Sequence, residues 1–444
     1  MIVHIETLGC SRNQVDSEIM LGRLVHAGHT SADDPSQAEV IVVNTCGFIS
    51  TASEEAVDVL LDMARYKKEG RCTRLIATGC LAQRYKDDKD LASSLPEVDA
   101  FLGTGACDLI VDVVENRASS ALVLFPDPNK RGFQDLSILR ELSQEKFAYV
   151  KVSEGCDRHC TYCIIPELRG RQRSRPGEDI EKEAEILLSK GIKEIILTAE
   201  NTTDYGRDLS EGTGFSRVLA RTARTMAARD ETAWLRFLYT HPSSLDLETI
   251  ETVRDHANIC SYYDVPIQHA SSAVLKRMGR PYTRENLKDL FKLIRKTDPE
   301  AVLRTTLIVG FPGETQKDFK ILLEFIHEIG FDHLGVFTYS DSEDLASHRL
   351  GDPVSAELAE QRHDQVMAAQ AGISLQVNEK HVGRVYPVMV EENPEPGVYI
   401  GRTMFQAPEV DGVTFIYSDG LEIGTRFHVK ITDAYEYDIA GEIA

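Results

Sequence analysis

Long apolar runs are missing from this sequence. No stretch approaches the length that a helix needs to cross a bilayer. Residues 1–8 have the pattern of a strand and not that of a basic segment followed by an apolar one. These absences argue against a transmembrane span and against a targeting signal, so we expect a cytoplasmic protein.

Positive charge is also in short supply. Lys and Arg together number 49 against 71 Asp and Glu among 444 residues, which gives a net charge of −22. A surface of this sign is poorly suited to nucleic acid or to an anionic membrane, and its field favours a basic partner. The imbalance continues in residues 378–444, which hold 12 acidic and 5 basic side chains. We therefore expect neither membrane binding nor direct binding of nucleic acid.

Cysteine is too sparse for a framework of disulfides. The chain holds only nine cysteines, and a scaffold stapled by disulfides is typical of much shorter, cysteine-dense chains. Metal binding or catalysis therefore accounts better for the cysteines that stand in recognisable positions.

Strand–helix alternation, by contrast, covers most of the chain. Residues 1–116 alternate short β-rich runs with helical periodicity, which predicts a parallel sheet covered by helices. Residues 117–144 contain several turn-forming residues and are interpreted as a linker. Six further units in residues 145–372 predict an open, partial (β/α)6 barrel, and the glycine-rich β pattern of residues 378–444 predicts a small β-barrel. The predicted fold class is α/β with a small third β domain. The barrel strands are expected at Phe147–Val152, Glu194–Thr198, Leu235–Tyr239, Tyr262–Pro266, Leu303–Val309 and His333–Thr338.

Three cysteines stand close together after the first predicted barrel strand. Cys156, Cys160 and Cys163, here called the loop triad, have the spacing CxxxCxxC. Thiolates are the usual ligands of iron–sulfur clusters, and a 4Fe–4S cube normally takes four. Three ligands leave one iron open for the amino and carboxylate groups of S-adenosylmethionine, which electron transfer from the cluster then cleaves. A zinc site with His159 as fourth ligand, or three unrelated cysteines, are the alternatives.

Three other cysteines are far apart in sequence but similarly placed. Cys10, Cys46 and Cys80, here called the sheet-edge triad, each follow a predicted strand of the N-terminal segment within one to three residues. Their intervals of 36 and 34 residues match one strand–helix unit. All three are therefore expected at the carboxyl edge of one parallel sheet, where open α/β folds bind ligands. They either hold a second cluster or are buried as small apolar residues.

Several short blocks are recognisable in combination. They are LGC at Leu8–Cys10, VNTC at Val43–Cys46, TGC at Thr78–Cys80, EGCDRHCTYCIIP at Glu154–Pro166, DVPIQH at Asp264–His269, LKRMGR at Leu275–Arg280 and IVGFPGET at Ile308–Thr315. Together they resemble the radical S-adenosylmethionine methylthiotransferase family over nearly the whole chain. The C-terminal segment resembles a TRAM domain.

The resemblance implies two 4Fe–4S clusters and S-adenosylmethionine as cofactors. By similarity, the sheet-edge triad binds an auxiliary cluster and the loop triad binds the radical-generating cluster. One molecule of S-adenosylmethionine methylates a sulfur at the auxiliary cluster. A second is cleaved to a 5′-deoxyadenosyl radical, which takes hydrogen from the substrate carbon that then receives the methylthio group.

Substrate divides the family into branches. The blocks LGCSRNQVDSE at Leu8–Glu18 and VNTCGFI at Val43–Ile49 are similar to the RimO branch. That branch modifies the β-carbon of an aspartate in ribosomal protein S-twelve of the small subunit, whereas other members modify an adenosine of tRNA. An acidic C-terminal segment favours a basic protein over RNA. We therefore expect S-twelve as a partner, together with an unidentified electron donor. A tRNA adenosine methylthiotransferase, or an iron–sulfur electron-transfer protein, is the alternative.

Four further residues are candidates for contact with S-adenosylmethionine. Tyr162, beside a ligand cysteine, fits either adenine contact or plain packing. Glu200 ends a strand within Ala-Glu-Asn, where sequences of the branch commonly have Ala-Gln-Asp, and Gln268 also follows a strand. Arg304 fits either the methionine carboxylate or a buried ion pair. The sequence identifies no catalytic acid or base.

The most basic local run follows the loop triad. It consists of Arg169, Arg171, Arg173 and Arg175. Such a run is interpreted either as a contact for an anionic substrate side chain or as a solvated loop.

Overall fold

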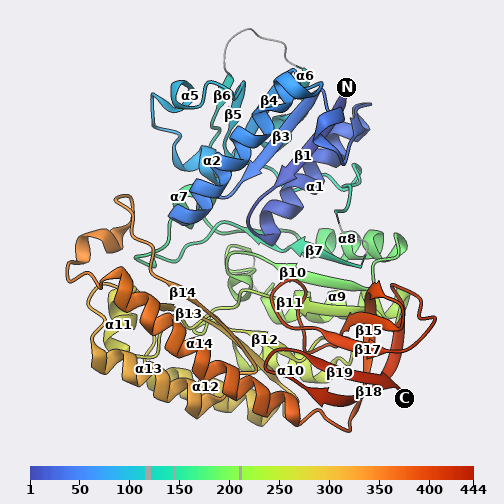
Figure 1. Cartoon of the computed structure of the whole chain (residues 1–444), viewed down its shortest axis with the longest axis vertical. Helices are drawn as coiled ribbons and strands as arrows, with labels where there is room; N and C mark the ends of the chain where they lie inside the picture. Colours follow the sequence, from blue (N-terminus) through green and yellow to red (C-terminus); the bar gives the residue numbers. More distant parts are fainter. Residues whose placement is uncertain (116–121, 144–145, 210–212) are drawn as a thin grey trace.

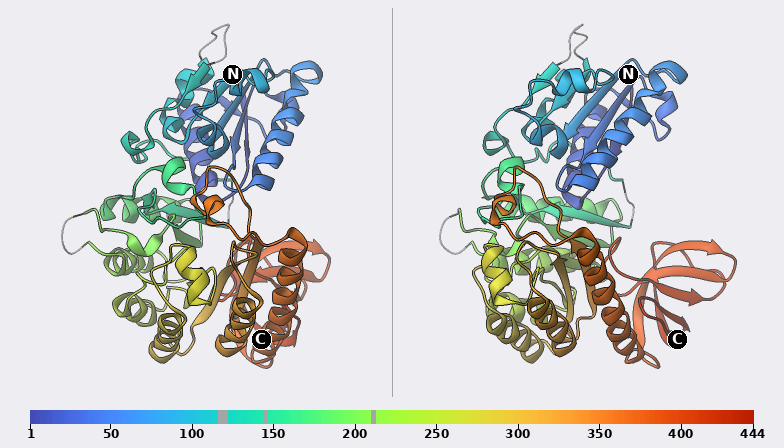
Figure 2. Two further views of the ribbon diagram at one scale, coloured as in Figure 1. Left: turned by 90° about the vertical axis from the view of Figure 1, so that its left-hand side faces the viewer. Right: turned by 60° about the vertical axis from the view of Figure 1, so that its left-hand side comes forward.

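A computed structural model describes residues 1–115, 122–143, 146–209 and 213–444. Figure 1 shows an N-terminal domain at one end of the long axis, a central barrel below it and a small C-terminal barrel beside the central one. In the right-hand view of Figure 2 the C-terminal barrel stands clear beside the central barrel. The α/β fold class predicted from the sequence is confirmed.

The N-terminal domain is a six-stranded parallel sheet in the order β2-β1-β3-β4-β5-β6. Alternate residues of β3 point to opposite faces, with Val40 and Val42 in one apolar cluster and Ile41 and Val43 in another. Both faces of the sheet are therefore covered, as parallel sheets require. The strands are β1 (Ile2–Thr7), β2 (Thr30–Ser31), β3 (Val40–Thr45), β4 (Arg74–Gly79), β5 (Ala100–Leu102) and β6 (Leu122–Leu124). The helices are α1 (Ser11–His26), α2 (Ser50–Ala64), α3 (Tyr66–Glu69), α4 (Cys80–Arg84), α5 (Leu91–Ser94) and α6 (Ile110–Glu115).

One strand of this sheet lies where the sequence predicts only a linker. β6 pairs with β5 in parallel through Val123 and Phe101. The strand was not expected because three residues are too few to show the alternation of a strand. Pairing with β5 stabilises it where the intrinsic β-propensity of its residues is not enough. Residues 117–121 and 144 of the predicted linker, and residue 145 of the predicted barrel, lie outside the described residues.

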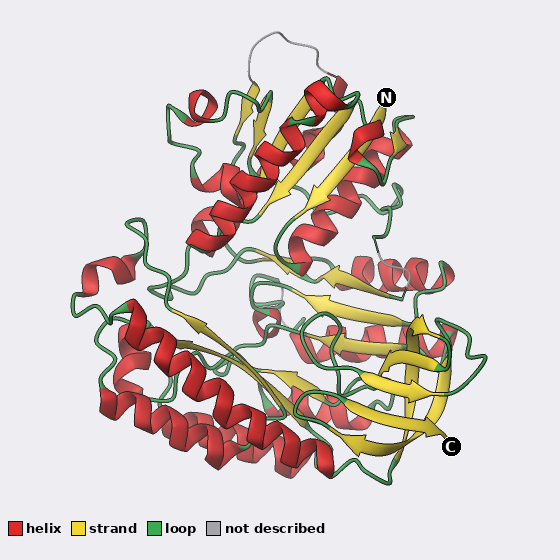
Figure 3. Cartoon of the chain, viewed as in Figure 1, coloured by secondary structure: helices red, strands yellow, loops and turns green. Residues whose placement is uncertain are grey.

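The central barrel contains six parallel strands in chain order. They form two three-stranded sheets, β11-β10-β7 and β12-β13-β14, which an isolated parallel bridge between Leu235 and Ile259 joins. The strands are β7 (Phe147–Lys151), β10 (Glu194–Thr198), β11 (Trp234–Phe237), β12 (Tyr262–Asp264), β13 (Val302–Val309) and β14 (His333–Thr338), with a short antiparallel pair β8 (Ser153–Glu154) and β9 (Arg173–Ser174). Figure 3 shows the helices packed outside these strands.

Local sequence signals fix the helix ends in the barrel. Thr283 and Asn286 form a capping box at the start of one helix, and Thr315 and Asp318 form another. Gly330 ends the second of these helices in the left-handed conformation. The helices are α7 (Ile165–Arg169), α8 (Gly177–Ser189), α9 (Phe215–Arg229), α10 (Leu247–Asp255), α11 (Ser272–Arg277), α12 (Arg284–Thr297), α13 (Gln316–Ile329) and α14 (Ala356–Glu379). Short 3-10 helices occur at Pro35–Gln37, Thr104–Leu109, Pro128–Lys130, Thr202–Asp204 and Ala346–Leu350.

The C-terminal domain is a closed barrel in the order β15-β16-β17-β19-β18. Val388, Val390, Ile416, Val429 and Ile431 fill its interior. Its strands are β15 (Val385–Glu395), β16 (Val398–Arg402), β17 (Thr414–Tyr417), β18 (Arg426–Ala434) and β19 (Ile439–Ile443). Helix α14 runs unbroken past residues 372 and 378, where the sequence places the end of one domain and the start of the next.

Buried ion pairs hold the C-terminal domain to the central barrel. Glu194 of β10 lies 2.7 Å from Arg236 of β11 and 2.7 Å from Arg402 of β16, and all three side chains are inaccessible or nearly so. A second contact joins Asp411 to the hydroxyl of Tyr262 at 2.6 Å. Among the described residues, none of the helices combines the length and apolar character that crossing a bilayer requires.

Candidate active site

The sheet-edge triad lies at the carboxyl ends of three adjacent strands. Cys10 caps helix α1 after β1, Cys46 follows β3, and Cys80 begins helix α4 directly after β4. Because β1 and β4 flank β3 in a parallel sheet, the three loops emerge side by side. The expected placement at one sheet edge is what the structure shows.

Two glycines allow these loops to approach one another. Gly9 has φ +94°, and a Cβ atom added there would lie 2.8 Å from Cβ of Cys46. Gly79 has φ +96°, and its Cβ would lie 2.5 Å from Oδ1 of Asn44. Both positions therefore exclude a side chain as well as requiring a conformation that favours glycine. This explains the Gly-Cys pairs in the first and third blocks.

A buried asparagine ties the loops of the triad together. The Asn13 side-chain amide donates to the carbonyl oxygens of Leu8 at 2.8 Å and Thr45 at 3.0 Å, and its own oxygen accepts from Arg169. Asn13 is fully buried. Sequence reasoning missed it, although its position three residues after Cys10 inside the block LGCSRN was a usable signal.

The loop triad is supported from a distant part of the barrel. The Thr161 backbone N–H donates to the carbonyl of Met278 at 3.0 Å, and its hydroxyl donates to the carbonyl of Arg277 at 2.9 Å. A Cβ atom at Gly279 would lie 2.8 Å from the carbonyl oxygen of His159. The block LKRMGR at residues 275–280 therefore serves as the platform on which the cysteine loop rests.

Both triads face one cavity of about 330 Å³. All nine cysteines of the chain are free thiols. The cavity is lined by the six cysteines of the two triads and, among others, by Arg12, Arg158, Tyr162, Glu200, Asn201, Tyr239, His241, Gln268 and Arg280. Two groups of three thiols, from different domains, thus line the same cavity.

Burial keeps most of these thiols protonated in the absence of a metal. It raises the pKa of Cys80 and of Cys156 to about 11 and that of Cys163 to about 12. Cys10 differs, because the guanidinium groups of Arg12 and Arg169 outweigh its burial and lower the pKa of its thiol. Metal ligation by cysteine requires the thiolate, so binding at these sites releases protons.

Three of the four predicted cofactor contacts line the cavity. They are Tyr162, Glu200 and Gln268. The Tyr162 hydroxyl accepts a hydrogen bond from Nε of Arg280 at 3.0 Å, and its ring meets the edge of Phe311. Gln268 has φ +67°, a strained conformation that β-strand neighbours hold through the backbone of Thr306 and Ile308.

Arg304 is not among the residues that line the cavity. Its guanidinium lies 2.9 Å from Asp264 and 3.5 Å from Asp411 of the C-terminal domain. Arg304 therefore forms the ion pair that was the alternative to a contact with the methionine carboxylate. Arg304 is the third residue of β13 and so lies near the amino end of the strand, whereas the cavity is lined by residues beyond the carboxyl ends of the barrel strands.

The arginine run is likewise structural. Arg169 and Arg175 are buried, Arg169 against Asp16 at 2.7 Å and Arg175 against Glu183 at 2.6 Å. Arg173 donates to the carbonyls of Pro128 and Arg131, and only Arg171 is exposed. The four side chains therefore form no common basic surface, which contradicts the interpretation as a single contact for an anionic substrate.

Two polar side chains in the cavity have atoms that form no hydrogen bond with the described residues, although Oε1 of Glu200 lies 3.6 Å from Nε of Arg12. Three buried atoms have no hydrogen-bond partner within the part of the chain that is described. They are the two carboxylate oxygens of Glu200 and Nε2 of His241. Burial and the nearby Glu154 carboxylate raise the pKa of Glu200, while burial and then Arg280 lower the pKa of His241 to about 2. Buried polar atoms of this kind are normally satisfied, so the cavity is built for a polar ligand.

Family comparisons agree with this architecture. Residues 2–103 match the model described as "Uncharacterized protein family UPF0004", residues 150–326 the Radical SAM superfamily and residues 382–444 the TRAM domain. Together, the fold and the two triads define a radical S-adenosylmethionine enzyme.

Curated relatives are similar over their whole length. Ribosomal protein uS12 methylthiotransferase RimO of Desulfosudis oleivorans is 49% identical over all of both chains. The protein of the same name from Clostridioides difficile is 43% identical over 99% of this chain and 98% of its own. This chain belongs to the RimO family of radical S-adenosylmethionine methylthiotransferases, and the resemblance drawn from the sequence blocks is confirmed.

Solved structures share the fold at low identity. The radical S-adenosylmethionine methyltransferase TsrM from Kitasatospora setae, with tryptophan and a cofactor analogue, has a TM-score of 0.55 and 13% identity. The match covers 92% of this chain and 80% of that one. At this identity the likeness concerns the fold alone.

The cofactors that family membership assigns are two 4Fe–4S clusters and S-adenosylmethionine, and the residues present fit them. Among the described residues, no three His, Cys, Asp or Glu side chains surround a single point closely enough to hold one metal ion. A four-iron cube binds its thiolates at separate corners and does not need such convergence. Each triad supplies three thiols, and the carboxylate of Glu200 and Nε2 of His241, which form no hydrogen bond with the described residues, supply polar contacts for a zwitterionic ligand.

Proposed function

We propose that this chain adds a methylthio group to the β-carbon of an aspartate in ribosomal protein uS12. The observation that carries the proposal is the meeting of two cysteine triads, from separate domains, in one cavity. When bound, the clusters and S-adenosylmethionine supply the one-electron chemistry, the sulfur and the methyl group. The protein binds and orients them and limits access of water.

We assign the auxiliary cluster to the domain of residues 1–116 and the radical-generating cluster to the barrel of residues 145–372. Cys10, Cys46 and Cys80 hold the first, and Cys156, Cys160 and Cys163 hold the second. Because both triads line one cavity, clusters bound there would hold sulfur close to the carbon that loses hydrogen, which favours transfer over release.

Glu200, Gln268 and His241 are proposed to bind polar groups of S-adenosylmethionine, with Tyr162 beside the adenine. The Nδ1 atom of His241 accepts the backbone N–H of Ser243 at 3.2 Å. In the neutral ring this leaves the proton on Nε2, the atom that lacks a protein partner. His241 therefore offers a donor to a carboxylate, and Glu200 offers an acceptor to an ammonium group.

The C-terminal domain, residues 378–444, is proposed to receive the basic protein substrate. Relatives are named for uS12, and ribosomal proteins are strongly basic. Arg402, one of the few basic residues here, is buried and neutralised by Glu194 and Glu391. The exposed charge is dominated by Glu392, Glu395, Asp419, Glu422, Asp433 and Glu436. Such a surface attracts a cationic protein and repels the phosphates of RNA.

We further propose that the enzyme works in the cytoplasm and receives electrons from a separate donor. The decisive experiment is anaerobic: the protein is reconstituted with iron and sulfide and mixed with S-adenosylmethionine, a reductant and uS12. We expect a gain of about 46 daltons on one aspartate, which is the replacement of hydrogen by methylthio. A gain on tRNA adenosine instead would refute the protein substrate. Absence of 5′-deoxyadenosine from protein that holds both clusters would indicate an electron-transfer protein.

A further inference from the structure

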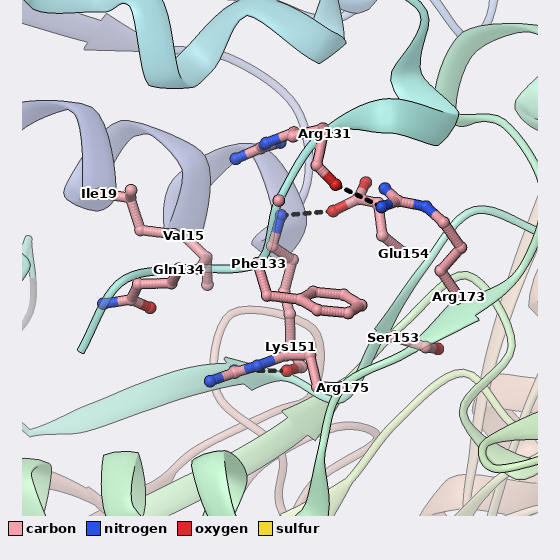
Figure 4. Close-up of a pocket in the computed structure, with 11 residues that line it drawn as sticks. Val15, Ile19, Arg131, Phe133, Gln134, Lys151, Ser153, Glu154, Arg173 and Arg175 are labelled. Atoms are coloured by element: carbon pink, nitrogen blue, oxygen red, sulfur yellow. Dashed lines mark hydrogen bonds and ion pairs between the residues drawn. The ribbon is translucent and has the colours of Figure 1, made fainter. Parts of the chain in front are cut away.

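A sealed group of five charged side chains lies where the N-terminal domain meets the barrel. Asp16 of α1 and Glu154 of β8 are its anions, and Lys151, Arg131 and Arg169 are its cations. Lys151 Nζ lies 2.7 Å from Asp16 and 2.6 Å from Glu154, and Arg131 lies 2.8 Å from Asp16. Arg169 lies 2.7 Å from Asp16 and 2.9 Å from Glu154. Figure 4 shows Lys151, Glu154 and Arg131 of this group around a small cavity of about 20 Å³.

Formal charges in this group do not cancel. Three cations face two anions, and every one of the five side chains is less than a tenth exposed. The neighbouring Arg12–Glu200 pair adds one charge of each sign, so one positive charge remains in excess. A buried charge without a partner is strongly unfavourable, so the surplus positive charge requires a further anion nearby.

Arg169 points toward the place where that anion belongs. Its Nη1 atom is taken up by the two carboxylates, while Nη2 faces Oδ1 of Asn13 and lies 3.7 Å from Sγ of Cys80. Both contacts of Nη2 are with the sheet-edge triad or with the residue that ties its loops together. A 4Fe–4S cluster held there by three thiolates is anionic in its oxidised form and supplies the missing charge.

Arg169 also lies close in sequence to the loop triad. It is the last residue of α7, which begins two residues after Cys163 of the loop triad. A short rigid helix therefore links the loop of one proposed cluster to a ligand of the other. The following Gly170 has φ +79°, which turns the chain away once the arginine is in place.

We infer that Arg169 is a positioning residue for the auxiliary cluster: it donates an N–H···S hydrogen bond to the Cys80 thiolate and raises the reduction potential of the cluster that Cys80 binds. The inference rests on the cluster role given to Cys10, Cys46 and Cys80 in the proposed function. Hydrogen bonds to ligand sulfur and nearby positive charge both stabilise the more reduced, more negative cluster. The barrel domain thus sets the potential of a cluster whose ligands all belong to the N-terminal domain.

The test measures the auxiliary cluster alone, in full-length protein carrying Cys156→Ala, Cys160→Ala and Cys163→Ala. In this background Arg169→Gln keeps a donor but removes the charge, and Arg169→Lys keeps the charge but loses the planar guanidinium. The matched control is Arg175→Lys, a buried arginine of the same run that pairs with Glu183. Midpoint potentials are determined by EPR-monitored redox titration, and bound iron is counted in each variant.

Arg169→Gln is expected to lower the midpoint potential by at least 59 mV, which is a tenfold change in the ratio of oxidised to reduced cluster for one electron. Arg169→Lys should fall between Arg169→Gln and the parent, and Arg175→Lys should match the parent. If Arg169→Gln retains no auxiliary iron while Arg175→Lys does, the test depends on Arg169→Lys alone. Its midpoint potential must then be lower than that of the parent.

Equal potentials in the parent and in the iron-loaded Arg169 variants would overturn the inference and leave the proposed function standing. So would an equal shift in Arg175→Lys, because the effect would then be general. A parent that binds no iron at all through Cys10, Cys46 and Cys80 would overturn the proposed function and the inference with it.

Discussion

Arg12 and Glu200 belong to different domains, yet Nε of Arg12 lies 3.6 Å from Oε1 of Glu200. Arg12 is in the first turn of α1, two residues after Cys10, and Glu200 follows the end of barrel strand β10. The same guanidinium donates to the carbonyl of Ala199 at 3.2 Å and lies over the ring of Tyr239 at 4.6 Å. The two cysteine sites therefore share a wall in which one domain supplies the cation and the other the anion.

The first prediction concerns the protonation of Glu200. Its pKa is raised by burial and by Glu154 despite Arg12, so the native state holds the proton more tightly than the unfolded state does. Stability is then lost as pH rises above the ordinary carboxyl range. In cluster-free protein, Glu200→Gln should be more stable than the parent at pH 8, and this advantage should shrink at pH 5. Urea unfolding at both pH values measures it, and an advantage independent of pH would count against the assignment.

His241 should destabilise the protein in mild acid. Burial and the surrounding arginines hold its pKa at about 2, whereas an unfolded histidine takes up a proton near pH 6.5. Proton binding by the unfolded state lowers stability as pH falls, by about 2 kcal/mol between pH 7 and pH 5 for one such group.

The variant His241→Asn should remove that part of the pH dependence, since asparagine can still accept from Ser243 through its side-chain oxygen. Urea unfolding at pH 7 and pH 5 gives the comparison. His363→Asn, on helix α14, controls for the loss of a histidine elsewhere. Identical pH dependence in parent and His241→Asn would be inconsistent with a buried neutral imidazole.

Each cysteine triad should account for half of the iron. Reconstituted parent protein is expected to hold about eight irons, and replacing either triad by alanine should leave about four. Only loss of the loop triad should abolish 5′-deoxyadenosine formation, whereas loss of the sheet-edge triad should abolish methylthiolation alone. Cys260→Ala, at a fully buried cysteine of the apolar core, should keep all the iron. Iron analysis and chromatography of the nucleoside check both points.

Glu194 should be essential for holding the C-terminal domain in place. Glu194→Gln leaves Arg236 and Arg402 buried with a weakened counter-charge. Arg402 retains Glu391, whereas no second carboxylate of the described residues pairs with Arg236. We expect a loss of about 3–5 kcal/mol in the free energy of unfolding. Glu392→Gln, which affects an exposed pair with Lys146 at 3.7 Å, should change it by less than about 0.5 kcal/mol. Chemical unfolding compares the two variants, and equal effects would show that burial of the pair is unimportant.

Parallel strands and their following loops were predictable because period and turn residues are local properties of the sequence. The strand expected at Glu194–Thr198 is found with those bounds, and the strand expected at Leu235–Tyr239 occurs at Trp234–Phe237. The sheet-edge placement of Cys10, Cys46 and Cys80 followed from the spacing of strand–helix units. β6 escaped prediction because its three residues gain their structure from pairing with β5.

The side-chain partners of the site were harder to foresee. Whether Arg304 meets a ligand or a carboxylate depends on Asp411, more than 100 residues away in another domain. Arg169 and Arg175 appeared as a basic loop because the acids that pair with them, Asp16 and Glu183, stand elsewhere in the chain. Asn13 and His241 carried a weaker signal: Asn13 lies three residues after Cys10 in the block LGCSRN, and His241 lies in the loop after β11.

Helix α14 sets the distance between the central barrel and anything that the C-terminal domain binds. Its 24 residues span about 36 Å, and it is fastened along its length. Arg362 bonds to the carbonyl of Glu314 and Gln370 to that of Phe331 in the barrel, while Asn378 bonds to the carbonyl of Tyr435 in the C-terminal domain. One inserted residue would rotate the end of the helix that carries Asn378 by about 100° relative to its barrel contacts. The number of residues in this one helix thus helps to set the angle at which a captured protein is presented to the cavity.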